Sequence, residues 1–243
     1  MENKKGNMTF FNITLARVPI YIKCLFPSTE VFCKNYLTEE KGKYSVAINK
    51  EDIEYEKKIS IYEAPDRYLE TLALYRKIAE LMIDENVLLF HCSALELDGD
   101  AYLFCGPSGA GKSTHARLWR ETFIDKNVHV INDDKPLIRF ENGKVYVFGT
   151  PWDGKERLSE NRSAPIKGIC FLNQSKINKI TKITGTEALP LLMKQTYRST
   201  DRNRLIKTIG LLNILCTRVP MYVMDCDISR EAAEISYNCM IEG

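Results

Sequence analysis

The sequence predicts an α/β fold with an α+β tendency, and three observations support this. A glycine-rich turn lies between an apolar strand and a helix over residues 101–122. A β-branched run over residues 128–134 ends in two aspartates, which suits a buried strand of an open α/β sheet. Short alternating or β-branched runs fill residues 8–62. We therefore expect a small β-rich region over residues 1–62 and a larger domain over residues 63–243.

The first region is predicted to consist of short strands. Alternating and β-branched residues indicate strands over residues 9–15, 20–26, 44–48 and 53–61. No catalytic pattern occurs here, so Cys24, Cys33 and Tyr36 are expected in the core. The role of the region stays open between docking, acceptor recognition and oligomer contact.

The larger domain is expected to begin with a connector helix over residues 65–86. Its apolar residues recur near helical spacing, with charged residues between them. We expect this helix to pack on the larger domain. A strand over residues 87–91 follows and ends in His91, and residues 94–97 and 101–105 then form a hairpin-like pair of strands.

The glycine-rich turn has the pattern G-x-x-x-x-G-K-[ST] of a phosphate-binding loop. It reads Gly106-Pro107-Ser108-Gly109-Ala110-Gly111-Lys112-Ser113-Thr114. Its glycines permit positive φ, so that successive N–H groups can wrap a phosphate, and the helix N-terminus behind them favours negative charge. Lys112 is predicted to reach the β and γ oxygens of ATP, and the Ser113 hydroxyl to bind Mg²⁺. The alternative, a glycine-rich turn that binds nothing, is disfavoured by the flanking strand and helix.

Two acids follow the next predicted strand. Asp133 and Asp134 come at its carboxyl end, where ligands bind in open α/β sheets. Either acid could hold Mg²⁺, directly or through water, or accept a proton from an attacking hydroxyl. The alternative is a solvated turn. The spacing alone does not divide these roles between the two residues.

A hairpin and a loop of unusual composition come next. Asn142-Gly143 predicts a type I′ turn between strands over residues 136–141 and 144–148. The loop over residues 149–155 contains Trp152, which either covers a base or acceptor or is an incidental surface residue. Asp153, Lys155 and Arg157 could contact metal or phosphate.

The remaining chain continues the alternation of strands and helices. We expect a buried strand over residues 166–172, an exposed turn and edge strand over 174–184, helices over 186–197 and 201–217, a strand over 219–226 and a helix opened by Ser229. A basic cluster between the two middle helices is either a solvated face or a source of an arginine that neutralises transition-state charge. Its members are Arg198, Arg202, Arg204 and Lys207.

Composition excludes several classes of function. The formal net charge of +2 and the lack of a basic run with interleaved aromatics argue against nucleic acid as a partner. The eight cysteines include no C-x-x-C pair, so we expect reduced thiols and neither a disulfide framework nor a zinc site. No signal-peptide pattern occurs, and no stretch approaches the ~20 apolar residues that span a bilayer. We expect a cytoplasmic protein with no membrane partner.

The residues around the glycine-rich turn resemble the catalytic domain of HPr kinase/phosphorylase, whose fold is related to the nucleotide site of phosphoenolpyruvate carboxykinase. The resemblance is carried by His91, the strand pair, Gly106 to Ser113 and the two acids. It covers about residues 87–140 with specific motifs, and the spacing of His91 from the loop agrees with that family. The chain departs from the family after the acids, where the family's metal-binding glutamate has no counterpart that we can place.

The resemblance implies a role for each of these residues. His91 would be the active-site histidine, Lys112 the phosphate-binding lysine and Ser113 a metal ligand. Asp134 would be the base that deprotonates the acceptor, with Asp133 on the metal side. The chain looks more like the divergent relatives that accompany peptide-modification gene clusters, which implies a peptide or small hydroxyl acceptor, and the family implies a homo-oligomer.

Residues and resemblance together predict an ATP- and Mg²⁺-dependent kinase that transfers the γ-phosphoryl group to a hydroxyl, most simply the serine of a protein or peptide. A non-catalytic nucleotide-binding accessory or regulatory module is one alternative. The other is a small-molecule kinase of the carboxykinase type. Both acids, Lys112 and Ser113 are intact, which favours the catalytic interpretation over the module.

Overall fold

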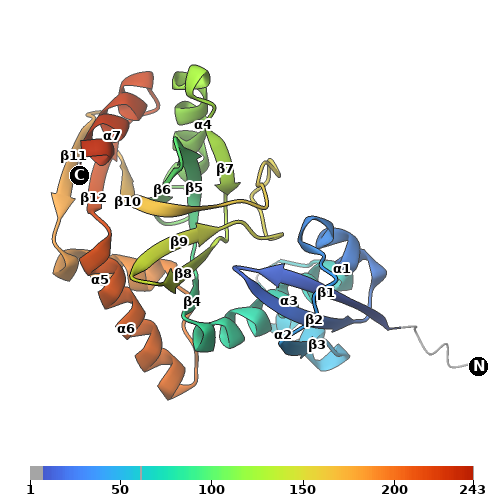
Figure 1. Cartoon of the computed structure of the whole chain (residues 1–243). Helices are drawn as coiled ribbons and strands as arrows, with labels where there is room; N and C mark the ends of the chain where they lie inside the picture. The colour runs from blue at the N-terminus through green and yellow to red at the C-terminus, as the bar shows by residue number, and fades with distance from the viewer. Residues whose placement is uncertain (1–7, 61, 243) are drawn as a thin grey trace, which may run out of the picture. The chain divides into compact units, whose positions relative to one another are not determined.

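The computed structural model describes residues 8–60 and 62–242 and is mixed α/β (Figure 1). The chain forms two compact units that divide between Glu85 and Asn86. Within the described residues, no helix combines the length and the apolar character needed to cross a membrane.

Over residues 8–60 and 62–85, the first unit contains a three-stranded sheet, three α-helices and two short 3-10 helices. Its strands are β1 (Thr9–Leu15), β2 (Val18–Cys24) and β3 (Tyr44–Ala47), with β2 in the centre, antiparallel to β1 and parallel to β3. Its helices are α1 (Pro27–Phe32), η1 (Lys34–Tyr36), α2 (Lys50–Ile59), α3 (Asp66–Met82) and η2 (Ile83–Glu85). The three strands lie where strands are expected, and Cys24, Cys33 and Tyr36 are buried as predicted.

The fourth predicted strand, residues 53–61, is wrong. Residues 50–59 form helix α2, and Ile61 lies outside the described residues. The helix begins with a capping box in which the Asn49 side chain accepts from the Asp52 backbone N–H and the Asp52 side chain accepts from the Asn49 backbone N–H. Only Ile53 and Glu56 are buried, three residues apart on one helical face. The capping box, with acidic residues in the first turn and basic residues in the last, favours a helix in this segment, although its spaced isoleucines also suit a strand.

Helix α3 falls within the first unit, so the boundary lies between residues 85 and 86 and not at residue 62. Glu70 of α3 is fully buried and accepts hydrogen bonds from the backbone N–H groups of Leu25 (2.6 Å) and Phe26 (3.2 Å). It also accepts from the Thr29 hydroxyl at 2.5 Å. One carboxylate thereby accepts hydrogen bonds from the backbone donors of the segment between β2 and α1.

The second unit is built on a nine-stranded sheet. Its strands are β4 (Val87–Leu89), β5 (Cys92–Leu97), β6 (Asp100–Cys105), β7 (His129–Asn132), β8 (Leu137–Glu141), β9 (Lys144–Phe148), β10 (Ser163–Gln174), β11 (Lys179–Ile183) and β12 (Met221–Cys226). The order is β4-β8-β9-β10-β6-β5-β7, and β12 pairs with β10 and with the edge strand β11. Asn142 (φ 50°) and Gly143 (φ 73°) make the predicted tight turn between β8 and β9.

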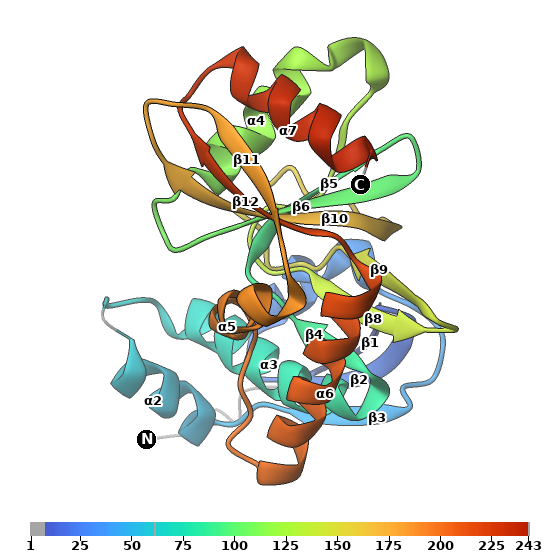
Figure 2. The same ribbon diagram turned by 90° about the vertical axis from the view of Figure 1, so that its left-hand side faces the viewer.

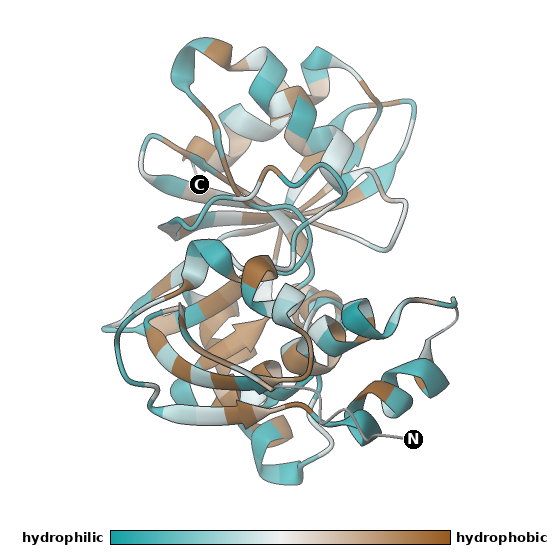
Figure 3. Cartoon of the chain, turned by 90° about the vertical axis from the view of Figure 1, so that its right-hand side faces the viewer, coloured by the Kyte–Doolittle hydropathy of each residue, from teal (hydrophilic) through white to brown (hydrophobic). Residues whose placement is uncertain are grey.

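Helices cover both faces of this sheet (Figure 2). They are α4 (Lys112–Thr122), η3 (Ile124–Lys126), α5 (Gly185–Gln195), α6 (Arg202–Arg218) and α7 (Arg230–Glu242). Helices α4 and α7 lie on one face, and α5 and α6 on the other. Colouring by hydropathy follows this layering, because the strands are mostly hydrophobic whereas loops and outward helix positions are mostly hydrophilic (Figure 3).

The core under α4 and α7 centres on Trp119, which is fully buried. Its ring lies 5.0 Å from Tyr102 and 5.2 Å from Phe104, centroid to centroid. Its indole N–H donates to Ser236 Oγ at 2.8 Å, and that hydroxyl donates to the Ala233 carbonyl. The polar end of the tryptophan is therefore satisfied, and α7 is fixed against α4.

The sheet register brings three chain segments to one edge. Strand β5 is antiparallel to both β6 and β7, with Cys92 opposite Cys105 and Ala94 opposite Asn132. The carboxyl ends of β6 and β7 and the amino end of β5 therefore lie side by side. The glycine-rich turn follows β6 and the two acids follow β7, whereas His91 directly precedes β5.

Replacing Glu70 with alanine tests the anchoring of α3. Glu70→Ala leaves two backbone donors without their acceptor, and we expect it to lower the free energy of unfolding by about 3 kcal/mol. Glu70→Gln, which keeps one carbonyl oxygen, should cost less, and the exposed Glu39→Ala should cost little. Urea unfolding followed by circular dichroism measures all three. Equal stability of Glu70→Ala and Glu39→Ala would contradict the anchoring role.

Candidate active site

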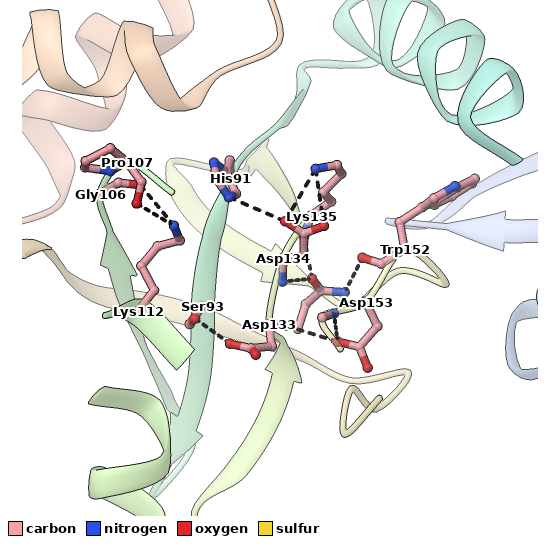
Figure 4. Close-up of polar contacts among 12 residues, drawn as sticks. His91, Ser93, Gly106, Pro107, Lys112, Asp133, Asp134, Lys135, Trp152 and Asp153 are labelled. Atoms are coloured by element: carbon pink, nitrogen blue, oxygen red, sulfur yellow. Dashed lines mark hydrogen bonds and ion pairs between the residues drawn. The ribbon is translucent and has the colours of Figure 1, made fainter. Parts of the chain in front are cut away.

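The site lies at the sheet edge shared by the ends of β6 and β7 and the start of β5 (Figure 4). All twelve residues predicted for it come to this edge. They are His91, the loop Gly106 to Thr114, Asp133 and Asp134. The edge belongs wholly to the second unit.

The glycine-rich loop turns sharply from β6 into α4. Gly109 (φ 83°) and Gly111 (φ 96°) have left-handed backbone conformations that favour glycine. The Ala110 N–H donates to the Pro107 carbonyl at 3.1 Å, and α4 begins at Lys112 directly after Gly111. The N–H groups of the first helical turn therefore face the loop, which is the arrangement that binds anions.

Lys112 lies across the start of this loop. Its Nζ donates to the carbonyls of Gly106 at 3.0 Å and Pro107 at 3.2 Å, and the side chain is largely buried. Burial lowers the pKa of Lys112, and the nearby acidic groups Cys105 and Asp134 oppose that shift. Lys112 and the acids are thus close enough to interact electrostatically.

Asp133 is held by hydroxyl groups. Ser93 of β5 donates to Asp133 Oδ1 at 2.5 Å. Burial raises the pKa of Asp133, and hydrogen bonds from Ser93 and Ser113 oppose that shift. The Ser113 hydroxyl of the loop is therefore near the carboxylate that follows β7, and both residues are predicted to hold metal.

Asn132 shapes the turn that carries both acids. Its Oδ1 accepts from the backbone N–H groups of Asp134 at 2.9 Å and Lys135 at 2.6 Å. Its Nδ2 donates to Thr150 O at 3.2 Å and Trp152 O at 3.3 Å. Asn132 is fully buried, so this side chain fixes the acid turn to the loop after β9. Sequence reasoning missed it; an asparagine two and three residues before turn N–H groups was the available signal.

The loop over residues 149–159 supports Asp133 from the other side. Asp153 accepts from the backbone N–H groups of Asp133 (3.3 Å), Gly154 (2.6 Å) and Ser159 (2.9 Å). A Cβ on Gly154 would lie 2.7 Å from Asp133 Oδ2. Only glycine therefore leaves enough room for this carboxylate in its present position. Asp153 is thus a structural partner of the acid turn.

Other predicted residues of this region lie differently. Trp152 is buried, so it is not an incidental surface residue, and Figure 4 shows its ring turned away from His91 and Lys112. Lys155 and Arg157 are exposed. Arg198 and Arg202 are also exposed, and within the described residues no hydrogen bond or ion pair joins them to the site.

His91 contacts the second acid. Its Nε2 lies 3.4 Å from Asp134 Oδ1, and Lys135 Nζ lies 3.2 Å from Asp134 Oδ2. Burial lowers the pKa of His91, the charges of Lys112 and Lys135 lower it further, and Asp134 opposes them. The imidazole is therefore neutral at pH 7. One carboxylate has a neutral histidine and a lysine as partners.

The end of α5 fixes His91 and the loop in position. The His91 N–H donates to the Gln195 carbonyl at 2.8 Å. The Gln195 amide, oriented so that its nitrogen faces acceptors, donates to His91 O at 3.0 Å and Gly106 O at 3.3 Å. Sequence reasoning had no signal for this residue, because its role depends on where α5 packs.

Two cavities flank the loop. One, of about 450 Å³, lies beside α4 and is lined by Gly111, Thr114 and His115 with the chain after β10 and β12. The other, of about 500 Å³, lies beside α5 and is lined by His91, Gly106 and Pro107 with the ends of β10 and β12. Within the described residues, no three His, Cys, Asp or Glu side chains are grouped as a metal site.

Comparison with known proteins gives a distant likeness only. No family model matches the chain. No curated protein matches it either. Among solved structures, the Hpr(Ser) kinase/phosphatase from Coxiella burnetii aligns over 64% of this chain and 99% of its own, with 12% identity and a TM-score of 0.33.

The close approach of Gly154 to Asp133 can be tested by a matched pair of substitutions. Gly154→Ala forces the carboxylate or the loop to move, and we expect the free energy of unfolding to fall by about 2 kcal/mol. Gly210→Ala, in the middle of α6 with open space around the new methyl group, should raise it by about 1 kcal/mol. Chemical denaturation measures both. Two shifts of the same sign would contradict this account of Gly154.

Proposed function

We propose that this chain is an ATP- and Mg²⁺-dependent phosphotransferase that moves the γ-phosphoryl group to a hydroxyl of a protein, a peptide or a small compound. One observation carries the proposal. The loop residue Lys112 and both acids interact electrostatically, Asp133 is held by the Ser93 hydroxyl, and the adjacent acid Asp134 contacts His91. A glycine-rich turn without function would not need two acids and a histidine at its mouth.

The type of fold proposed is the phosphate-loop domain of HPr kinase and phosphoenolpyruvate carboxykinase. Two features support it beyond the sequence resemblance of residues 87–140. The antiparallel strand β5 lies between the strand that leads into the loop and the strand that ends in the acids. His91 precedes β5 and therefore reaches the same edge as the loop.

The loop suits a polyphosphate. Its left-handed glycines expose backbone N–H groups, and the first turn of α4 adds a favourable partial charge. Lys112 supplies the one buried ammonium at this point, and its hydrogen bonds to two carbonyls can be exchanged for phosphate oxygens. The cavity beside α4 adjoins the later half of the loop, so we assign it to the nucleoside.

The site also suits Mg²⁺. This ion is usually held by one or two protein ligands with phosphate oxygens and water completing its shell, so a cluster of three acids is not required. Ser113 and Asp133 are the proposed oxygen ligands, and Ser113 is near enough to Asp133 to oppose the rise of its pKa. When bound, the ion would neutralise charge on the phosphate oxygens.

Asp134 is the proposed base. As the acceptor oxygen bonds to the γ-phosphorus and the bond to the ADP oxygen breaks, the hydroxyl proton passes to an Asp134 carboxylate oxygen. The neutral His91 holds that carboxylate in position without competing as a cation, and Lys135 Nζ lies 3.2 Å from its other oxygen. Lys112 balances the charge that develops on the transferred group.

Replacing Asp134 with asparagine tests its role as the base. Asp134→Asn keeps the shape but removes the proton acceptor, so we expect kcat to fall about a hundredfold or more with nucleotide affinity nearly unchanged. Label transfer from γ-labelled ATP to candidate peptides and small hydroxyl compounds measures turnover, and calorimetry measures nucleotide binding. The exposed Asp125→Asn is the matched control.

Two results of this assay would change the conclusion. Normal turnover by Asp134→Asn removes this residue from the chemistry. Tight ATP binding by the wild type with no phosphorylated product from any acceptor favours a non-catalytic nucleotide-binding module.

The metal role of Ser113 is tested within the loop itself. Ser113→Ala removes one proposed oxygen ligand, and we expect the Mg²⁺ concentration for half-maximal nucleotide binding to rise about tenfold or more. Ser108→Ala removes a hydroxyl of the same loop to which no metal role is assigned, and it should leave the Mg²⁺ requirement unchanged. Equal shifts for the two variants would exclude Ser113 as the ligand.

A further inference from the structure

The cavity beside α5 is the strongest unassigned feature of the second unit. Its volume of about 500 Å³ lies in the range of pockets that bind small molecules. It is bounded by the chain just before β5, the first residues of the glycine-rich loop, the ends of β10 and β12, and α5. We call it the α5 pocket. The nucleotide is assigned to the other side of the loop.

The walls of the α5 pocket are largely apolar. Phe171 of β10 and Val223 of β12 are register partners in the parallel pair, so their side chains share one face of the sheet. Leu191 of α5 adds a third apolar side chain to the lining. Such walls favour a ligand with an apolar body, because its burial removes apolar surface from water.

Lys194 is the charged group of this pocket that is free to meet a ligand. It is exposed, and among the described residues no hydrogen bond or ion pair joins it to another side chain. The other polar groups of the pocket are engaged: the Asn173 amide donates to Asp225 at 3.2 Å, and Gln195 bonds to His91 and Gly106. An apolar chamber with one free ammonium group is complementary to a molecule with an apolar body and a single anionic group.

The pocket is continuous with the proposed transfer site. His91 lines the pocket and also contacts Asp134 at 3.4 Å. Gly106 and Pro107 line it as well, and their carbonyls accept from Lys112. A hydroxyl at the inner end of the pocket therefore lies next to both the proposed base and the phosphate-binding lysine.

We propose that the α5 pocket binds the phosphoryl acceptor, and that this acceptor is a small hydroxyl compound with an apolar body and one anionic group held by Lys194. The assignment as acceptor rests on the proposed phosphotransferase function. The ligand preference of the pocket stands on its own walls and charge, so the two can be tested apart.

Binding of two matched fluorescent probes tests the ligand preference. 8-Anilinonaphthalene-1-sulfonate has an apolar body and one anionic group, and N-phenyl-1-naphthylamine has the same body without the sulfonate. Both are titrated into the full chain in the presence of Mg²⁺ and ATP, so that the nucleotide side is filled. We expect saturable binding of both, with the sulfonate bound more tightly.

Two pocket variants and one control variant test whether the probes bind in the α5 pocket. Lys194→Ala should weaken the sulfonate about three- to fivefold, the worth of one partly exposed ion pair, and leave the neutral probe unchanged. Leu191→Trp, checked for native thermal unfolding, should abolish saturable binding of both. Lys50→Ala removes an exposed lysine of the first unit and should change neither. Equal effects of Lys194→Ala on the two probes, or wild-type binding by Leu191→Trp, would overturn the pocket assignment.

A transfer assay tests the acceptor role. Wild-type protein with γ-labelled ATP should label 8-hydroxyoctanoate faster than 1-octanol, and Lys194→Ala should lose this preference. Equal labelling of the two compounds, or labelling of peptides alone, overturns the small anionic acceptor. If no acceptor of any kind is labelled while the sulfonate probe still discriminates Lys194→Ala, the phosphotransferase function fails and the ligand preference of the pocket remains.

Discussion

The antiparallel pairing of β5 with β6 on one side and β7 on the other is the constraint on which the candidate site depends. It sets the start of β5 level with the ends of its two neighbours, so that His91, the loop and the acids share an edge. Side chains alternate across a sheet, and a slip of one residue would move Ser93 to the opposite face, away from Asp133. Hydrophobic packing of the buried residues of β5 against α4 prevents that slip, because the whole strand is buried. Core packing in this unit therefore also fixes the geometry of the site.

Charge balance is the second constraint. Lys112 is buried, which penalises its charged form, and the two carboxylates lie where they offset that penalty. Asp133 is itself partly desolvated and accepts a hydrogen bond from the Ser93 hydroxyl of β5. Lys112 donates to the carbonyls of Gly106 and Pro107, and no hydrogen bond or ion pair joins it to Asp133 among the described residues. Under the proposed function, neither group would therefore have to leave an ion pair before it meets a phosphate or a metal ion.

The sequence was sufficient for the parts of the site whose chemistry is local. The glycine-rich loop, the strand ending in two acids and the Asn142-Gly143 turn each carry their signal within a few residues. Asn132 caps N–H groups two and three residues later and carries a local signal, whereas Ser93, Gly154 and Gln195 could not be predicted, because each acts on a residue brought near only by the fold. The same reason explains the error over α3, whose apolar stripe shows that it packs but not on which unit. The strand expected over residues 53–61 is wrong for a different reason, because the capping box of Asn49 and Asp52 just before it favours a helix.

The positions of the two cavities bear on where a nucleotide and an acceptor would bind. Both adjoin the glycine-rich loop, yet one is lined by α4 and the other by α5, and these helices cover opposite faces of the sheet. A triphosphate seated in the loop with its nucleoside beside α4 would present its far end toward Asp134 and His91, on the side from which the α5 pocket opens. Under the proposed function, an acceptor in that pocket would approach the γ-phosphorus from the side away from the leaving ADP, as in-line displacement requires. The placement of α4 and α5 on opposite faces would then separate donor from acceptor, with the loop between them.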